Sequence, residues 1–271
     1  MSDAILVDCC NVNTRFGAHH VLKDVSLTIR PGETVGLVGE SGSGKTTLGR
    51  AILGIGPVSA GEILYEGTNI AGVAPRDRRG NAAAIQAVFQ DPYSSLNPSM
   101  TVEDILIEPI VARGLASASE ASAKVNTLLD QVALPADAAQ RYPREFSGGQ
   151  RQRVAIARAL ALSPRLIVCD EPVSALDLST QARVLDLFID IQQATGVAYL
   201  FVSHDLTVVR HISHRVAVMR NGEIVEFDEC DQVTANPSHD YTKRLLLAAP
   251  VADPARQAER RAAFRALAGE H

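Results

Sequence analysis

The stretch GESGSGKT, residues 39–46, decides the fold of this 271-residue chain because it fits the pattern GxxxxGK[ST]. The apolar run Glu33–Val38 before it predicts a strand, and Thr46–Leu53 after it predicts a helix. Glycines let the backbone turn N–H groups towards phosphate oxygens, and the helix N-terminus adds the positive end of its dipole. Lys45 supplies a charge for the β- and γ-phosphates, and Thr46 supplies a hydroxyl for Mg²⁺. The stretch therefore predicts a phosphate-binding loop made by Gly39, Ser41, Gly42, Ser43, Gly44, Lys45, Thr46 and Thr47.

A second element complements this loop. The apolar run Leu166–Cys169 predicts a buried strand, and it ends in two carboxylates, Asp170 and Glu171. In proteins with such a phosphate loop, an aspartate at a strand end holds Mg²⁺, and this gives Asp170 its expected role. Glu171 follows as the expected general base for an attacking water. The alternative, that one carboxylate only caps the next segment, is weaker for Asp170 than for Glu171.

Composition excludes several classes of protein. Lys plus Arg number 26 and Asp plus Glu number 31, so the net charge is −5, which argues against broad binding to nucleic acid or anionic lipid. The chain is 46% hydrophobic and 21% charged, as is typical of a globular protein. The most apolar stretches fall short of the roughly 20 residues that a spanning helix needs. The four cysteines form no CxxC pair, so we expect free thiols rather than disulfides or a zinc site.

Further elements follow from hydrophobic periodicity. Val25, Leu27 and Ile29 alternate with polar residues and predict a half-buried antiparallel strand. Asn221-Gly222 predicts a tight hairpin turn. Residues 91–146 lack strand-like runs and predict helices, one of which buries a face made of Val125, Leu128, Leu129 and Val132. The remaining strands are expected at Glu62–Tyr65, Val197–Val202, Val216–Met219 and Glu223–Phe227.

The motif Phe146-Ser147-Gly148-Gly149-Gln150 discriminates among phosphate-loop proteins. Together with the two elements above, it resembles the signature of ATP-binding cassette (ABC) proteins, and the resemblance extends over residues 5–249. Phe146 stands where the family usually has leucine, a packing position. The remaining family motifs occur in order: an adenine-stacking aromatic at Phe16, a Q-loop at Gln90, a D-loop at Asp177 and a switch histidine at His204.

The resemblance implies the ABC ATPase fold. This is an α/β fold in which a P-loop NTPase core with a mixed sheet carries an N-terminal antiparallel β subdomain and an inserted α-helical subdomain. The helical insert is expected at about residues 91–160 of a single domain, residues 1–249. Residues 250–271 are expected to form a C-terminal tail.

The resemblance also implies a mechanism with ATP and Mg²⁺. Two such domains are expected to close head to tail on two ATP molecules, with Ser147, Gly148, Gly149 and Gln150 of one meeting the γ-phosphate held by the other. Mg²⁺ is expected on Thr46, Gln90 and Asp170. Asp177 is expected to communicate across the dimer, and the expected catalytic residues are Lys45, Gln90, Glu171 and His204.

A narrower resemblance points to the oligopeptide and dipeptide importer branch. It rests on Ile85–Pro98, on GESGSGKTT at residues 39–47, and on Pro237–Thr242 with Leu245-Leu246. It implies a peripheral ATPase on the cytoplasmic face of the cell membrane. The implied partners are transmembrane permease subunits, a second ATPase (identical or paralogous) and, indirectly, an extracellular solute-binding protein, but no nucleic acid. The solute itself does not follow from this sequence.

Other phosphate-loop ATPases remain as alternatives. A soluble ABC ATPase of translation usually carries two cassettes in one chain. One of DNA repair or chromosome organisation carries a long coiled coil, for which the interval from Lys45 to Ser147 leaves no space. A P-loop kinase would lack the element at residues 147–150.

Overall fold

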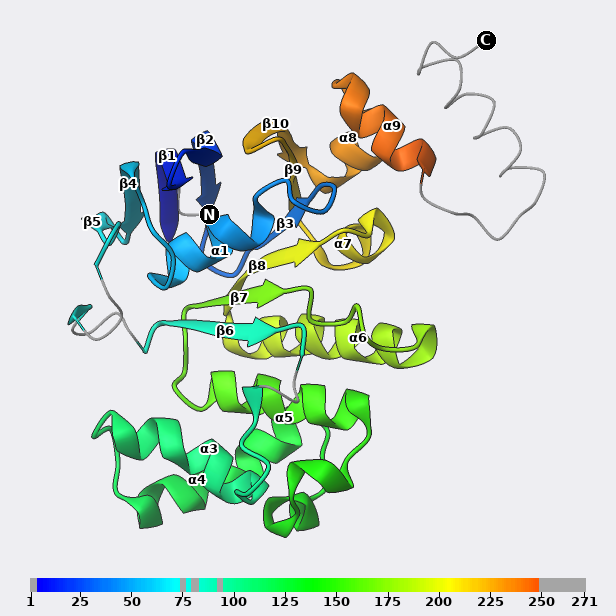
Figure 1. Cartoon of the computed structure of the whole chain (residues 1–271). Helices are drawn as coiled ribbons and strands as arrows, with labels where there is room; N and C mark the ends of the chain where they lie inside the picture. Colours follow the sequence, from blue (N-terminus) through cyan, green and yellow to red (C-terminus); the bar gives the residue numbers. More distant parts are fainter. Residues whose placement is uncertain (1–3, 74–76, 79–82, 92–94, 249–271) are drawn as a thin grey trace. The chain divides into compact units, whose positions relative to one another are not determined.

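The computed structural model describes residues 4–73, 77–78, 83–91 and 95–248. Figure 1 shows the order of helices and strands along the chain, which forms two compact units. The first unit is built from the chain before Val73 and after Leu200, and the second unit from residues 73–200. The tail expected at residues 250–271 lies outside the described residues. The expectation of a single domain over residues 1–249 stays a prediction.

An antiparallel sheet at the start of the first unit has the strand order β2-β1-β4-β5. Val7 pairs with Ile29 on one side and with Tyr65 on the other. The alternating burial of Val25, Leu27 and Ile29 confirms the predicted half-buried strand. The strands are β1 (Val7–Phe16), β2 (His19–Ile29), β4 (Ala60–Tyr65) and β5 (Thr68–Asn69).

The phosphate loop follows the central strand of the first unit, β3 (Thr34–Val38), all of whose residues are buried. β3 runs parallel to β9 (Arg215–Arg220), and β9 pairs antiparallel with β10 (Glu223–Glu229). Asn221 and Gly222 between them have φ values of 50° and 89°, so the predicted hairpin turn is confirmed. The first unit's helices are α1 (Lys45–Leu53), α7 (Leu206–Ile212), α8 (Cys230–Ala235) and α9 (Asp240–Ala248).

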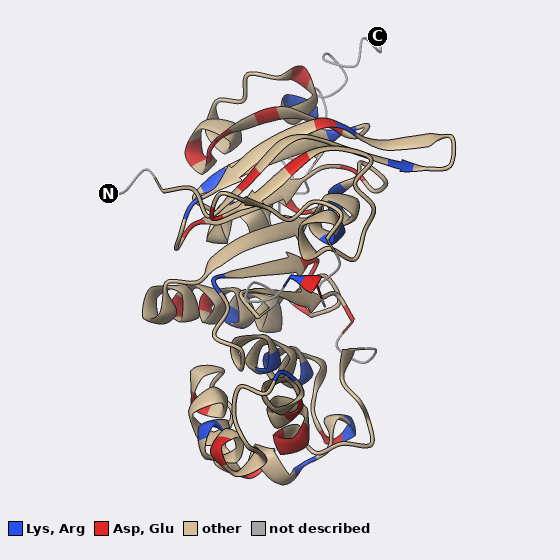
Figure 2. Ribbon diagram, turned by 90° about the vertical axis from the view of Figure 1, so that its left-hand side faces the viewer, with Lys and Arg blue, Asp and Glu red and all other residues tan. Residues whose placement is uncertain are grey.

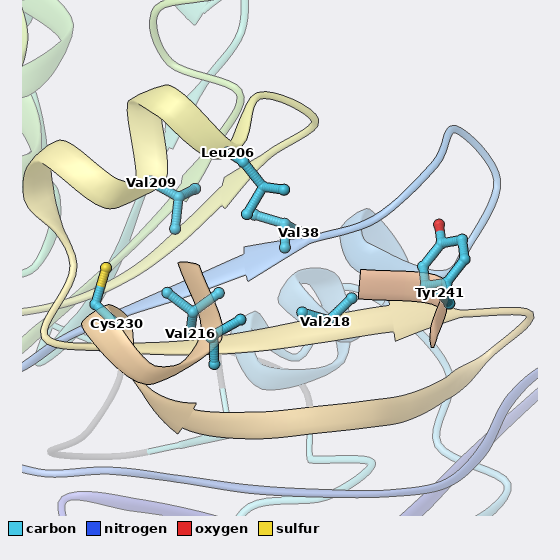
Figure 3. Packing of buried hydrophobic residues seen from close by; sticks show 8 residues of the cluster. Val38, Leu206, Val209, Val216, Val218, Cys230 and Tyr241 are labelled. Carbon is cyan, nitrogen blue, oxygen red and sulfur yellow. The ribbon is translucent and has the colours of Figure 1, made fainter. Parts of the chain in front are cut away.

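An apolar cluster joins strand β3 to the C-terminal helices. It brings Val38 of β3 together with α7, β9, α8 and Tyr241 of α9 (Figure 3). Burial of this apolar surface stabilises the unit. The cluster therefore fixes the end of β3, from which the loop departs, against the C-terminal part of the chain.

The second unit contains two parallel strands and most of the helices. β6 (Ile85–Phe89) pairs in parallel with β7 (Leu166–Asp170). The described residues between 91 and 146 form helices and turns, as predicted, and the apolar face of α4 is buried. Capping boxes at Thr101 and Ser117 begin the helices α3 and α4. The helices are α3 (Val102–Ala112), α4 (Ala118–Gln131), η2 (Ala136–Gln140), η3 (Pro143–Glu145), α5 (Gly148–Leu160) and α6 (Leu178–Thr195).

Strand β8 (Ala198–Ser203) begins in the second unit, and its residues 201–203 belong to the first. Acidic and basic residues are interspersed along the ribbons of each unit (Figure 2). Over the described part of the chain, none of the helices combines the length and the hydropathy needed to cross a membrane.

Candidate nucleotide site

The predicted site residues fall into two groups, one in each unit. The first unit holds the phosphate loop, Phe16 and His204, and the second holds the other predicted residues. Those of the second unit are Gln90, Ser147, Gly148, Gly149, Gln150, Asp170, Glu171 and Asp177.

The backbone of the phosphate loop takes conformations that only glycine adopts readily. Gly39, Gly42 and Gly44 have φ values of 154°, 80° and 109°. A Cβ on Gly39 would lie 2.1 Å from the carbonyl oxygen of Met219, so a side chain there would displace the neighbouring strand. Gly44 is the N-cap of α1 and brings no side chain to cap the helix. The start of α1 is therefore suited to receive an external anion.

Lys45 is buried inside the loop that it belongs to. Its Nζ donates hydrogen bonds to the carbonyl oxygens of Gly39, at 2.8 Å, and Glu40, at 2.9 Å. The side-chain oxygen of Ser43 is also buried, and it has no hydrogen-bond partner among the described residues. A fixed cation and an unsatisfied hydroxyl within a glycine-rich loop fit a phosphate group.

Two further predicted residues of the first unit are exposed. Phe16, at the end of β1, is 54% exposed although its side chain is large and apolar. His204 follows β8 directly and is also exposed, and Asp205 then caps the start of α7. Both side chains are thus accessible to a ligand.

In the second unit, the register of two parallel strands brings three predicted residues to the same edge. Phe89, the last residue of β6, is paired with Asp170, the last residue of β7, so Gln90 and Glu171 directly follow the two strands. The carboxyl ends of parallel strands are where open α/β sheets bind ligands. The register therefore places Gln90, Asp170 and Glu171 at the same end of the two strands, and their roles stay a prediction.

Glu171 itself has a strained backbone. Its φ is 51°, in the left-handed region that residues other than glycine rarely adopt. Its carbonyl oxygen accepts hydrogen bonds from the N–H and the hydroxyl of Ser174, at 3.3 and 3.0 Å. Such strain tends to be retained at functional sites, where the surrounding structure enforces it.

The signature motif forms the start of α5. Ser147 is the N-cap, and its hydroxyl accepts the N–H of Gln150 while its own N–H donates to Oε1 of Gln150. The helix begins at Gly148. A Cβ on Gly149 would lie 2.3 Å from Cγ2 of Thr180, so only glycine allows α5 to approach α6 this closely. Phe146 is buried, in agreement with its expected packing role.

Asp177 caps the start of α6. Its carboxylate accepts the N–H groups of Ser179 and Thr180, both at 3.1 Å, and the hydroxyl of Ser179 at 2.7 Å. The hydrogen bonds from Thr180 and Ser179 hold the pKa of this carboxyl well below its usual range. The next residue, Leu178, is 85% exposed although its side chain is large and apolar. It was not among the predicted site residues, although its apolar side chain directly follows a family motif.

The arginines of α5 have partners within the second unit. Arg153 donates to the carbonyl of Ala133, and Arg158 forms an ion pair with Glu108 at 3.3 Å. Arg151 is buried and donates to the carbonyl of Pro143. A role in the packing of the second unit accounts for these three side chains.

Comparison with known proteins identifies relatives of this chain by sequence. The chain is 50% identical over 242 residues to the glutathione import ATP-binding protein GsiA of Shigella boydii serotype 4 (strain Sb227). It is also 50% identical to the protein of that name from Escherichia coli (strain K12). Each match covers 89% of this chain but 39% of the relative, so the chain spans about two fifths of the length of these curated relatives.

Solved structures show the same fold. The chain aligns with cbiO1 from Clostridium perfringens, part of the ABC transporter complex cbiONQ, with a TM-score of 0.78 and 25% identity over 86% of this chain and 92% of that one. It aligns with MJ1267 in its ADP conformation, an ATP-binding cassette of an ABC transporter, with a TM-score of 0.76 and 26% identity over 86% and 96%. The predicted ABC ATPase fold is confirmed. The family model described as ABC transporter matches residues 22–174, more than half of the chain, and the chain therefore belongs to the ABC transporter family.

Proposed function

We propose that this chain binds and hydrolyses ATP and so powers solute import by a membrane transporter. The observation that carries the proposal is the phosphate loop, in which the ammonium of Lys45 is held by two loop carbonyls. A cation held in a curled, glycine-rich backbone is suited to a polyphosphate. Because the chain belongs to the ABC transporter family, we infer that ATP hydrolysis is coupled to transport.

The first unit would hold the nucleotide. The loop residues Gly39, Ser41, Gly42, Ser43 and Gly44 and the first turn of α1, with Thr46 and Thr47, would donate hydrogen bonds to the phosphates. Lys45 would release the loop carbonyls and turn to the β- and γ-phosphates. The exposed ring of Phe16 would stack on the adenine.

The other predicted residues would take part in hydrolysis. When bound, Mg²⁺ supplies positive charge that neutralises the phosphates, and Thr46, Gln90 and Asp170 offer the oxygen ligands that it prefers. Glu171 would accept the proton of the attacking water. His204 would hold the γ-phosphate in position, and Gln90 would respond to its loss.

A second copy or a paralogue would complete each site. The start of α5, with Ser147, Gly148, Gly149 and Gln150, would face the γ-phosphate bound by the partner. The close contact of Gly149 with Thr180 ties this helix start to the segment capped by Asp177. A change at the partner's nucleotide would thus reach Asp177 through packed groups.

A groove in the second unit is suited to a permease helix. Its volume is about 700 Å³, and its lining includes Phe89, Glu108, Arg113, Arg158 and Leu162. Phe89 directly precedes Gln90, so a helix seated there would be one residue from a group that responds to the γ-phosphate. The chain would act as a peripheral subunit on the cytoplasmic face of the membrane, with permease subunits providing the pathway and an extracellular protein delivering the solute.

The proposed solute is a small peptide or a related compound. The relatives in Shigella boydii and Escherichia coli are named for glutathione import, and glutathione is a tripeptide. The relatives' names favour an importer over a soluble ATPase of translation, repair or chromosome organisation.

The test is recovery of partners from detergent-solubilised native membranes with a tagged chain, followed by mass spectrometry. We expect multispan permease chains to be recovered with the wild type. Ala112→Arg, at the groove, should reduce that recovery at least fivefold, because a long charged side chain would fill the space. Ala123→Arg, on the exposed side of α4, is the matched control and should leave recovery unchanged.

Two results would contradict the proposal at different points. Recovery of only soluble partners by the wild type would remove the importer assignment while leaving the ATPase chemistry. Equal recovery of permease chains by both arginine variants would remove the groove as the docking site.

A further inference from the structure

The C-terminal helix contacts the phosphate loop directly. The backbone N–H of Glu40 donates a hydrogen bond to the hydroxyl of Tyr241 at 3.1 Å, across 201 positions of sequence. Tyr241 lies near the start of α9 and is only 4% exposed. Figure 3 shows its hydroxyl directed towards the loop that follows Val38. Tyr241 lies within Pro237–Thr242, a segment to which the family resemblance gave no role.

The loop is held at a second point from the same side. The N–H of Gly222, in the turn between β9 and β10, donates to the carbonyl oxygen of Ser43 at 2.9 Å. The carbonyl of Met219, at the end of β9, lies against Gly39. The hairpin therefore holds the loop at Ser43, and Tyr241 holds it at Glu40.

The position of Tyr241 is itself determined by several contacts. The buried carboxylate of Glu226 accepts the N–H groups of Ser238 and His239, at 2.7 and 3.2 Å, just before α9 begins. The guanidinium of Arg220 lies 4.9 Å from the centre of the Tyr241 ring. The ring also belongs to the apolar cluster around Val38. Tyr241 is therefore a fixed support rather than a mobile surface side chain.

We propose that Tyr241 is a positioning residue for nucleotide binding: its hydroxyl holds the Glu40 peptide so that the loop is already curled when the phosphates arrive. The proposal rests on the proposed function, in which this loop binds ATP. A binding loop that is ordered beforehand loses less conformational entropy on binding. Loss of the hydroxyl should therefore weaken binding without altering the chemical step.

The test is Tyr241→Phe, which removes the hydroxyl but keeps the ring and its packing. We expect the Kd for a fluorescent ATP analogue and the KM for ATP to rise about threefold to tenfold, the range for one lost hydrogen bond. The kcat at saturating ATP should stay at the wild-type value. Hydrogen–deuterium exchange of the loop peptide, residues 38–48, should be faster in the nucleotide-free variant.

Tyr199→Phe is the matched control. Tyr199 is a fully buried tyrosine of the second unit whose hydroxyl has no hydrogen-bond partner in the described part of the chain. Its removal should change neither nucleotide affinity nor exchange in the loop. A general loss of stability would instead raise exchange throughout Tyr241→Phe, beyond the loop peptide, and this result would overturn the positioning role.

Lys45→Ala separates the two proposals. The role of Tyr241 alone would be overturned by one combination of results. In that combination Lys45→Ala loses ATP binding, while Tyr241→Phe keeps wild-type affinity and wild-type exchange in the loop. Wild-type affinity in Lys45→Ala would contradict the proposed phosphate loop itself. Weaker binding in both variants, with an unchanged kcat in Tyr241→Phe, would support both proposals.

Discussion

Glu171 combines a reactive side chain with a costly backbone conformation. The φ of Glu171 is 51°, in the left-handed region. A residue other than glycine that adopts this region destabilises the fold by about 1–3 kcal/mol. The hydrogen bonds that Ser174 donates to the Glu171 carbonyl help to offset this cost. The chain thus accepts local strain at the residue that we propose as the general base.

Glu171→Gln tests this residue with little change of shape. We expect kcat for ATP hydrolysis to fall about 100-fold or more, since general-base catalysis contributes about 10²–10⁴-fold. Nucleotide affinity should be retained because the loop is in the first unit. Phosphate release and ATP binding are measured on the same preparation.

Glu66→Gln is the matched control for this measurement. Glu66 is an exposed glutamate that also has a positive φ, 47°, and it stands in the turn between β4 and β5. Its substitution should leave hydrolysis unchanged. Hydrolysis at the wild-type rate by Glu171→Gln would remove the assignment of the general base.

At the scale of elements, Glu226 of β10 holds the start of α9. Burial raises the pKa of its carboxyl, but hydrogen bonds that include those from Ser238 and His239 outweigh this and leave the pKa below its usual value. Since the folded-state pKa is lowered, the stabilisation is present above the unfolded value of about 4.3 and is lost as the pH falls through the folded value.

Glu226→Gln should therefore destabilise the protein at pH 7 and much less in acid. We expect a loss of about 1–2 kcal/mol at pH 7, because hydrogen bonds to a charged acceptor are replaced by bonds to a neutral one. The gap to the wild type should narrow as the pH falls from 7 to 3. Urea unfolding at both pH values measures it, with the exposed Glu223→Gln of the same strand as control. A gap independent of pH would exclude the carboxylate as its source.

The secondary-structure elements differ in how far their local sequence predicts them. Strand β7 is a continuous buried apolar run, and the hairpin after β9 has the turn residues that its φ values require, so both were predicted. Strand β6 was not, because Gln86 and Ala87 interrupt its pattern and only two of its residues are buried. Helix α6 was also missed, although its buried Val184, Leu187, Phe188 and Ile191 follow helical spacing.

The candidate site also contains features that local sequence predicts and features that it does not. The residues of local motifs were predicted, since the loop and the signature carry their glycines and caps in adjacent positions. The bond between Glu40 and Tyr241 was not predicted, because its partners are 201 positions apart and tertiary packing alone brings them together. Pro237–Thr242 was noted as a resemblance, but a resemblance gave no role to its tyrosine.

At the scale of the whole molecule, Leu178 bears on the proposed dimer. It is 85% exposed and stands between Asp177 and Ser179, in the segment that we expect to face a second ATPase subunit. A partner surface that covers this side chain would remove its apolar area from water, which is favourable. Complete burial of a leucine contributes about 1.5–3 kcal/mol.

Leu178→Asp should accordingly weaken the ATP-bound dimer by about tenfold or more, since each 1.4 kcal/mol is a factor of ten. The comparison uses the Glu171→Gln background, in which hydrolysis does not reopen the dimer, and sedimentation velocity with ATP and Mg²⁺ over a range of concentrations. Leu115→Asp is the control, because Leu115 is also exposed, at 58%, and precedes α4. It introduces the same charge in the same unit, outside the proposed interface. If the two aspartate variants dimerise equally well, the exposed leucine is not covered by the partner, and the head-to-tail arrangement must bury a different surface.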